Sequence, residues 1–271
     1  MVRAVGALVL LTVLTSVADD DTTFRRGMYG IGGAHHHKFE SNVLEREFLL
    51  LVHQPLERLS EDPMPVLYLL DGGLTFPMMA GYYNYLRLQE AVPDMLVVGI
   101  SYGGMTFAEG NLRGTDYTAP SAERDYYGGA STFQQVLDDE IFPLIETEYP
   151  ADPSRRVLFG QSLGGQFVVF TALTRPQLFY GYIASNPALH RNVEHFIRLT
   201  RSADAAARLV VIIADEDSEQ FVEPRNRWLR AWQEDPPFEM TIEQVPRHGH
   251  FSVAPEALFR GLRLLMPGPD S

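Results

Sequence analysis

The residues best suited to chemistry lie in residues 156–170, RVLFGQSLGGQFVVF. A short apolar run ends in a Gly-x-Ser-x-Gly motif centred on Ser162 and continues directly into a second apolar run with helical spacing. A strand, a tight turn and a helix in this order are typical of a nucleophile elbow, which holds a reactive serine in a strained backbone conformation. We expect crowding at that turn to leave no room for side chains at Gly160 or Gly164. The motif predicts Ser162 as the nucleophile of an acyl-transfer reaction.

A serine nucleophile needs a base within hydrogen-bond reach. After a nucleophile elbow, the acid and then the histidine follow along the chain, each just after a strand. The alternating residues 238–245 predict a strand that runs into His248, Gly249 and His250. His250 is the favoured base, because it lies nearest the final helix and Gly249 lets the loop bend toward Ser162. His248 remains the alternative, and activity is expected to fall in mildly acidic solution as the imidazole protonates.

The acid that orients this base is expected after the apolar strand Leu209–Ala214, where the chain reads DEDSE. Asp217 is the predicted acid, with Glu216 and then Glu219 as alternatives. The remaining charges of this run are expected to belong to the solvated start of a helix.

Backbone N–H groups that stabilise a developing oxyanion complete such a site. The buried run at residues 66–70 ends in Asp71-Gly72-Gly73, and a glycine turn at the carboxyl end of a buried strand is where open α/β sheets build ligand sites. We therefore predict Gly73 and Leu163 as the two oxyanion donors.

The elements that must position these residues alternate along the chain between apolar strands and amphipathic helices. This alternation predicts an α/β fold with a mainly parallel central sheet covered by helices on both faces. With no internal repeat and no linker, residues 37–271 are expected to form a single domain. The expected strands, besides the one before Ser162, are residues 39–43, 45–52, 66–70, 95–101, 181–184, Leu209–Ala214 and 238–245, and the expected helices are residues 131–145, the one after Ser162, residues 193–199 and Ala254–Leu265.

The first residues differ from the rest of the chain. Arg3 precedes an almost wholly apolar stretch, and the small residues Ser16 and Ala18 precede an acidic run. This order predicts that residues 1–18 are a secretory signal peptide cut after Ala18, giving a periplasmic or secreted protein without stable membrane insertion. The apolar stretch is too short for a comfortable membrane span, although an uncleaved anchor stays open as the competing interpretation. Residues 19–36 are expected to be irregular.

Composition narrows the classes of partner. The 271 residues include 22 Lys and Arg against 35 Asp and Glu, a formal net charge of −13, which argues against nucleic acid or an anionic membrane as a partner. The chain has no cysteine, so disulfides, thiolate metal sites and a cysteine nucleophile are excluded. The three consecutive histidines at residues 35–37 point to alternate faces of an extended chain and do not predict a metal site. The proposed chemistry requires no metal or cofactor, only a small-molecule ester, and the sequence makes no prediction of oligomeric state.

Taken together, these motifs resemble the putative esterase family of α/β-hydrolases, on its esterase D-like branch. The resemblance implies the α/β-hydrolase fold and a serine esterase with a Ser-His-Asp triad, and the residue after Asp-Gly in the family's oxyanion turn corresponds to Gly73. The closing His-x-Ser-Val-x-Pro run is most similar to siderophore esterases and supports His250 over His248. The chain departs from many members in having Ala214 where a glycine opens the acid motif, although the spacing still points to Asp217. The matching segments are residues 65–72, 97–100, 113–117, 160–165, 185–187 and 250–258.

Substrate selection is expected to fall to the long polar and aromatic segment 102–130 and to the aromatic residues 76–85. Arg113 and Tyr117 are the candidate substrate contacts, Arg113 through an anionic group of the substrate. An aromatic lining would suit an aryl, catecholate or siderophore-type ester, but aromatic clusters also serve as plain core packing. An exported acyltransferase on the same triad and a binding protein on a hydrolase scaffold remain the alternatives.

Overall fold

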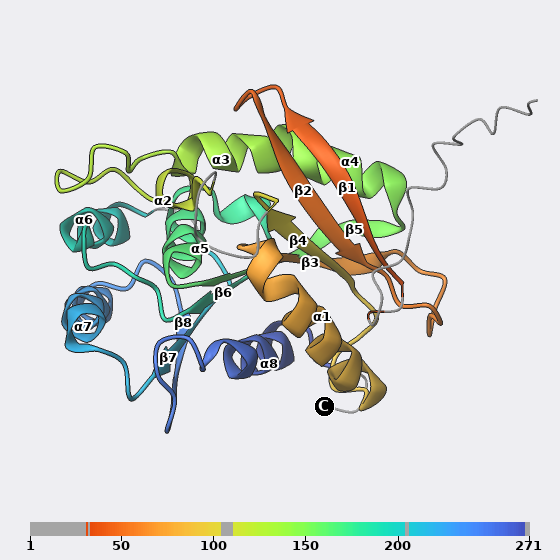
Figure 1. Cartoon of the computed structure of the whole chain (residues 1–271). Coiled ribbons are helices and arrows are strands. Elements are labelled where there is room, and N and C mark those ends of the chain that lie inside the picture. Colours follow the sequence, from red (N-terminus) through yellow and green to blue (C-terminus); the bar gives the residue numbers. More distant parts are fainter. Residues whose placement is uncertain (1–30, 32, 104–110, 204–205, 269–271) are drawn as a thin grey trace, which may run out of the picture.

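A computed structural model describes residues 31–268 apart from residues 32, 104–110 and 204–205. Its centre is an eight-stranded sheet in the order β1-β2-β4-β3-β5-β6-β7-β8 (Figure 1). The pairs β1–β2 and β2–β4 are antiparallel and the other five are parallel, so the predicted mainly parallel sheet is confirmed. The strands are β1 (Ala34–Ser41), β2 (Arg46–His53), β3 (Met64–Leu69), β4 (Leu96–Ser101), β5 (Ala151–Gln161), β6 (Gly181–Ser185), β7 (Leu209–Ala214) and β8 (Met240–Val245).

Helices cover both faces of the sheet, as the alternation predicts. The helices α1 (Gly72–Leu88) and α8 (Ala254–Leu265) lie on one face, and the opposite face is covered by α3 (Ala130–Val136), α4 (Phe142–Glu148), α5 (Leu163–Thr174), α6 (Val193–Ser202) and α7 (Glu219–Glu234) (Figure 1). A five-residue π-helical segment, Leu137–Ile141, joins α3 to α4, and the short helix α2 (Arg113–Asp116) lies in the long segment after β4.

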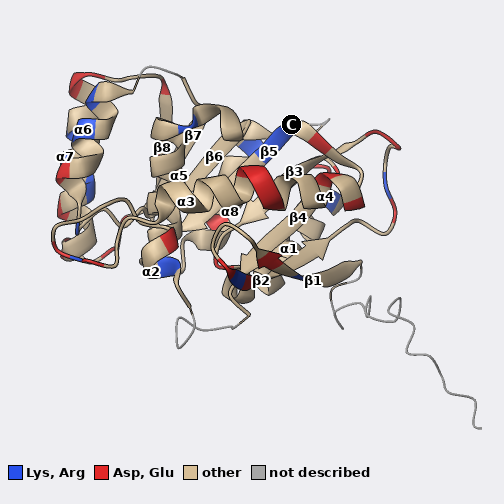
Figure 2. Ribbon diagram, turned by 90° about the horizontal axis from the view of Figure 1, so that it is seen from above, with Lys and Arg blue, Asp and Glu red and all other residues tan. Residues whose placement is uncertain are grey.

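Each face of the sheet has its own hydrophobic core. Along β3, Tyr68 packs into the cluster beneath α3–α7, whereas Leu67 and Leu69 pack into the cluster beneath α1 and α8. All six residues of β3 are buried, because a strand covered on both faces offers no side to water. The strands β3, β4, β6 and β7 carry no charged residue, and Figure 2 shows charges of both signs on the peripheral helices α6 and α7.

The amino-terminal boundary differs from the expectation. Strand β1 starts at Ala34 and pairs with β2 through His53, so the prediction of irregular structure up to residue 36 is wrong for residues 34–36. His37 Nε2 lies 2.5 Å from the Tyr149 hydroxyl, and the described residues contain no group of His, Cys, Asp and Glu side chains that could hold a metal ion. The predicted signal peptide lies outside the described residues. Among those that are described, no helix is long and apolar enough to cross a membrane.

The predicted catalytic residues lie at one edge of the sheet. Asp71, Ser162, Asp217 and His250 follow the carboxyl ends of β3, β5, β7 and β8. Because these strands are parallel, their carboxyl ends meet at one edge, where open α/β sheets place their ligand sites.

Candidate active site

Ser162 lies at the turn between β5 and α5 with φ 59° and ψ −113°, outside the conformations that a residue with a side chain favours. Three backbone hydrogen bonds hold it there: its N–H donates to Ser185 O at 3.0 Å, and its carbonyl accepts from Gln166 N at 2.9 Å and Ala188 N at 3.0 Å. The strain is therefore maintained by β6 and by the first turn of α5.

The glycines of the motif allow this close packing. A Cβ on Gly160 would lie 2.3 Å from the backbone C and O of Gly164, so the predicted crowding at Gly160 is confirmed. The same expectation for Gly164 is wrong, since a Cβ there would approach Leu70 and Asp71 no closer than 3.4 Å, an ordinary contact. Gly165 is the second crowded position, because its Cβ would lie 2.8 Å from Ser185 O.

The structure brings together the serine, histidine and aspartate selected from the sequence. His250 Nε2 lies 2.9 Å from Ser162 Oγ, while His250 Nδ1 lies 3.1 and 3.0 Å from the two carboxylate oxygens of Asp217. The Asp217 side chain is fully buried. In this arrangement the carboxylate can orient the imidazole, and the imidazole can accept the hydroxyl proton.

The alternative residues lie elsewhere. His248 Nδ1 lies 3.1 Å from the carbonyl of Ser252 within its own loop, and Glu216 and Glu219 are exposed. The hydrogen-bonded geometry is thus specific to Asp217 and His250.

Two helix N-termini adjoin the serine. Leu163 is the first residue of α5, and Gly73 is the second residue of α1. The first N–H groups of a helix have no partner within the helix, so both can face an anion. The two N-termini are close together, because a Cβ on Gly164 would lie 3.6 Å from Asp71 Oδ2.

Arg113 and Tyr117, the predicted substrate contacts, lie behind this turn. Arg113 donates two hydrogen bonds to the Asp71 carboxylate at 2.7 and 2.8 Å, and the Asp71 N–H donates to the Tyr117 hydroxyl at 3.2 Å. Burial raises the pKa of Asp71, and the charge of Arg113 opposes that rise. Tyr117 is fully buried. The structure therefore places both side chains where they hold Asp71 at the start of α1, and contact with substrate stays a prediction.

Several side chains that surround the triad are not among the residues predicted from the sequence. Phe221 stacks on the His250 imidazole, with ring centroids 4.1 Å apart, and His190 packs edge-on against Phe221. Arg225 lies 3.3 Å from Asp217, and both Gln161 and Asn186 donate to the His250 carbonyl. Gln161 and Asn186 lie in the matching segments 160–165 and 185–187, whereas no motif marks Phe221, His190 or Arg225. The position of Gln161 inside the elbow and of Asn186 at the end of a strand could have drawn attention to these two residues.

Comparison with known proteins decides the family. A model of the "Putative esterase" family matches residues 41–244 of the chain. The chain belongs to this family. It is a carboxylic ester hydrolase with the α/β-hydrolase fold, and the resemblance seen in the sequence is confirmed.

Among relatives of this esterase, the ferri-bacillibactin esterase BesA of Bacillus subtilis is 29% identical over 88% of this chain and 91% of its own length. The apo-salmochelin esterase of Escherichia coli is 31% identical over 48% of this chain and 43% of its own length. Among solved structures, the BES protein from Bacillus cereus is 21% identical and has a TM-score of 0.73, covering 97% of this chain and 99% of that one. The siderophore hydrolase EstB from Aspergillus nidulans is 19% identical and has a TM-score of 0.75, covering 89% of this chain and 97% of that one. These two structures share the fold of the esterase.

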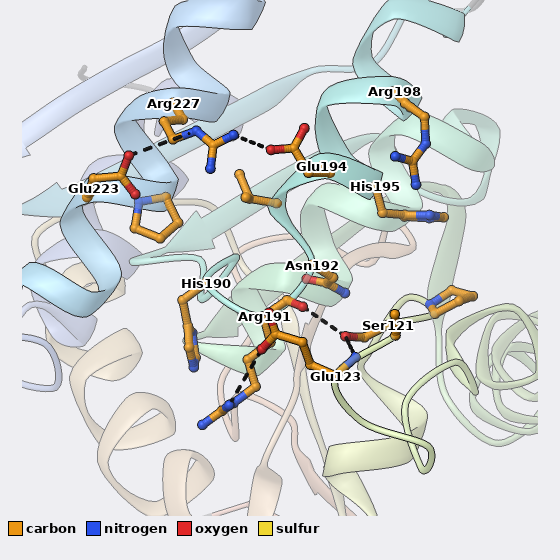
Figure 3. Close-up of a pocket in the computed structure, with 14 residues that line it drawn as sticks. Ser121, Glu123, His190, Arg191, Asn192, Glu194, His195, Arg198, Glu223 and Arg227 are labelled. Carbon is orange, nitrogen blue, oxygen red and sulfur yellow. Dashed lines mark hydrogen bonds and ion pairs between the residues drawn. The ribbon is translucent and has the colours of Figure 1, made fainter.

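A pocket of about 470 Å³ lies beside the triad of the esterase, between residues 120–123, residues 190–195 and helices α6 and α7 (Figure 3). Its wall includes His190, which packs against Phe221, the ring that stacks on the imidazole of His250. Ser121 Oγ donates to Arg191 O at 2.8 Å and ties the long segment to the loop after β6. Within residues 76–85, Phe76, Met79 and Tyr83 are buried in the core beneath α1, whereas Met78 and Tyr85 are exposed. Contact of this segment with substrate stays a prediction.

Proposed function

We propose that the esterase hydrolyses carboxylic esters through an acyl-enzyme on Ser162. The observation that carries this proposal is the pair of contacts made by the His250 imidazole, 2.9 Å to Ser162 Oγ on one side and 3.0 Å to the Asp217 carboxylate on the other. A nucleophile bonded to a base that is itself oriented by an acid is the geometry that activates a hydroxyl.

The reaction has two steps. His250 Nε2 accepts the Ser162 Oγ proton while Oγ bonds to the ester carbonyl carbon, and the Gly73 and Leu163 N–H groups stabilise the oxyanion. The intermediate collapses as the alcohol leaves with the proton held by His250. Water then gives a proton to His250 as it attacks the acyl carbon, and His250 passes this proton to Ser162 Oγ as the bond to the carboxylic acid breaks. Each oxyanion donor should lower the activation free energy of this reaction by about 3–4 kcal/mol.

The proposed substrates are siderophore-type esters, with aryl and catecholate esters as the wider class. The names of the curated relatives support this proposal, since they include a ferri-bacillibactin esterase, a siderophore triacetylfusarinine C esterase and an apo-salmochelin esterase. The pocket beside Phe221 is large enough for part of such a ligand. It is lined mainly by polar and charged side chains, which suits a substrate that carries hydroxyl groups or charge around its ester bonds.

Hydrolysis rates on a substrate panel test this proposal. The panel contains p-nitrophenyl acyl esters of several lengths, a feruloyl ester and a cyclic ester of a catecholate siderophore, each with wild-type protein and with Ser162→Ala. We expect the siderophore ester to have the highest kcat/KM and Ser162→Ala to abolish turnover. A preference for simple acyl esters would contradict the proposed substrate class, and ester product formed from an added alcohol acceptor would indicate an acyltransferase instead.

We also propose that the esterase is exported, on the basis of residues 1–18. Amino-terminal sequencing of the protein recovered from the medium or the periplasm should begin at Asp19. A product that begins at Met1 and stays with the membrane would instead indicate an uncleaved anchor.

A further inference from the structure

A buried arginine lies directly behind the acid of the triad. Arg225, in the second turn of α7, has an exposed fraction of only 3%, and its Nη1 lies 3.3 Å from Asp217 Oδ2. A buried guanidinium is costly unless a counter-charge pairs with it, and Asp217 supplies that charge. Burial lowers the pKa of Arg225, and the Asp217 carboxylate opposes this effect. The acid of the triad is therefore one half of a buried ion pair.

Asn186 joins this ion pair to the backbone of the base. Its Oδ1 accepts from Arg225 Nη1 at 3.3 Å and from Ala214 N at 2.8 Å, and its Nδ2 donates to the His250 carbonyl at 3.2 Å. Asn186 has φ 39°, so its backbone occupies the left-handed region just after β6. Gln161, the residue before the nucleophile, donates to the same His250 carbonyl and accepts from Ser185 Oγ. One continuous set of hydrogen bonds thus links acid, base and elbow.

We propose that Arg225 is a positioning residue that holds Asp217 beneath His250 as a carboxylate and, through its positive charge, lowers the pH at which the Asp217–His250 pair takes up a proton. This inference rests on the proposed roles of Ser162, Asp217 and His250. Arg225 itself does not contact the serine; it acts through Asp217.

The direction of the charge effect follows from the groups around the imidazole. Asp217, in the loop before α7, contacts the imidazole, and Arg225 of α7 pairs with Asp217. The aromatic ring of Phe221 stacks on the imidazole, and His190 packs against Phe221. The neighbouring His248 is held by its own loop. The active pair carries one negative charge, which Arg225 balances. Without that positive charge the pair binds a proton more readily, whichever of its atoms takes the proton.

The pH dependence of kcat/KM separates this role from a structural one. We would measure it from pH 5 to pH 9.5 on a p-nitrophenyl ester for wild type, Arg225→Met, Arg225→Gln and Arg225→Lys, with thermal unfolding of each variant. The acid limb of Arg225→Met should move up by about 1–2 pH units, so the loss of activity is large at neutral pH and mostly recovered at pH 9. Arg225→Gln, which keeps amide donors but no charge, should shift in the same direction. Arg225→Lys should stay closer to wild type than to either neutral variant.

Arg87→Met is the matched control. Arg87 forms a mostly buried ion pair with Asp94, 2.5 Å apart, at the end of α1 away from the triad. This variant should lose stability without moving the acid limb. The inference is overturned if Arg225→Met or Arg225→Gln loses activity by the same factor at every pH. If Arg225→Met does not fold, Arg225→Gln decides the matter alone. A wild-type protein that folds but hydrolyses no ester would instead contradict the proposed function, which keeps the two failures distinct.

Discussion

Replacing Gly160 with alanine should damage the elbow more than any other single methyl group. The added Cβ would lie 2.3 Å from the C and O atoms of Gly164, whereas ordinary contact begins at about 3.4 Å. The atoms that must give way belong to the backbone of α5's first turn, not to a flexible side chain. The turn that carries Ser162 must therefore open by about 1 Å, the difference between these distances.

Two magnitudes follow from this displacement. Overpacking of a well-packed interior costs roughly 1–3 kcal/mol of unfolding free energy, and backbone contacts place Gly160→Ala at or above the upper end. A shift of about 1 Å in a catalytic group costs on the order of 100-fold in rate. Gly81→Ala is the opposite case, because nothing lies within 4 Å of its Cβ position in the middle of α1. That variant should be stabilised by about 0.5–1 kcal/mol, since alanine restricts the unfolded chain and favours the helix.

Urea unfolding and ester hydrolysis of the two variants provide the assay. Gly160→Ala should lose both stability and kcat, and Gly81→Ala should gain stability with unchanged kcat. Wild-type stability and activity in Gly160→Ala would refute the argument that close backbone approach maintains the strained serine.

Three further substitutions test the surroundings of the triad. Asp217→Asn should lower kcat by roughly 10³–10⁴-fold with little change in KM, because the amide no longer fixes the protonation of His250; steady-state kinetics that show less than a tenfold loss would contradict this. Arg113→Met leaves the Asp71 carboxyl, whose pKa burial already raises, without its counter-charge, so urea unfolding should show a loss of about 3–5 kcal/mol; a loss below 1 kcal/mol would show that the pair stabilises little. Phe221→Leu removes the ring stacked on the imidazole and should lower kcat/KM by roughly 2–10-fold, as expected for an aromatic contact; unchanged kinetics would assign Phe221 to packing alone.

Local patterns were sufficient for much of the fold. The apolar run Leu209–Ala214 is β7, and the amphipathic repeat Ala254–Leu265 is α8, both with the expected bounds. The first is a short run rich in β-branched residues, which is typical of a strand buried on both faces, and the second has the apolar spacing of an amphipathic helix. Ser162, Asp217 and His250 could be selected because each follows a recognisable strand, and parallel strands bring such positions to one edge.

Pairings between distant segments could not be predicted in the same way. Arg113 and Asp71 are 42 positions apart in the sequence. Nothing in the sequence around Arg113 distinguishes an arginine in an internal ion pair from one that contacts substrate. Arg225 looks like one more charge on an amphipathic helix until the helix packs against Asp217. The composition of residues 76–85 does not tell which of their side chains point into the core. Phe76 and Tyr83 belong to the core because they lie on the face of α1 that meets the sheet. The crowding expected at Gly164 is wrong because its Cβ position faces Leu70 and Asp71 at an ordinary contact distance, whereas Gly165 faces the backbone of Ser185 in β6.

The central claim is that Ser162 is activated by His250 and Asp217. Mass-spectrometric mapping of the adduct formed with a fluorophosphonate probe tests it most directly, with wild-type protein compared against Ser162→Ala and His250→Gln. The account predicts a single adduct on Ser162, none in Ser162→Ala, and labelling at least 100-fold slower in folded His250→Gln, since general-base assistance contributes about 10²–10⁴-fold. An adduct on another residue, or folded wild-type protein that stays unlabelled, would contradict it.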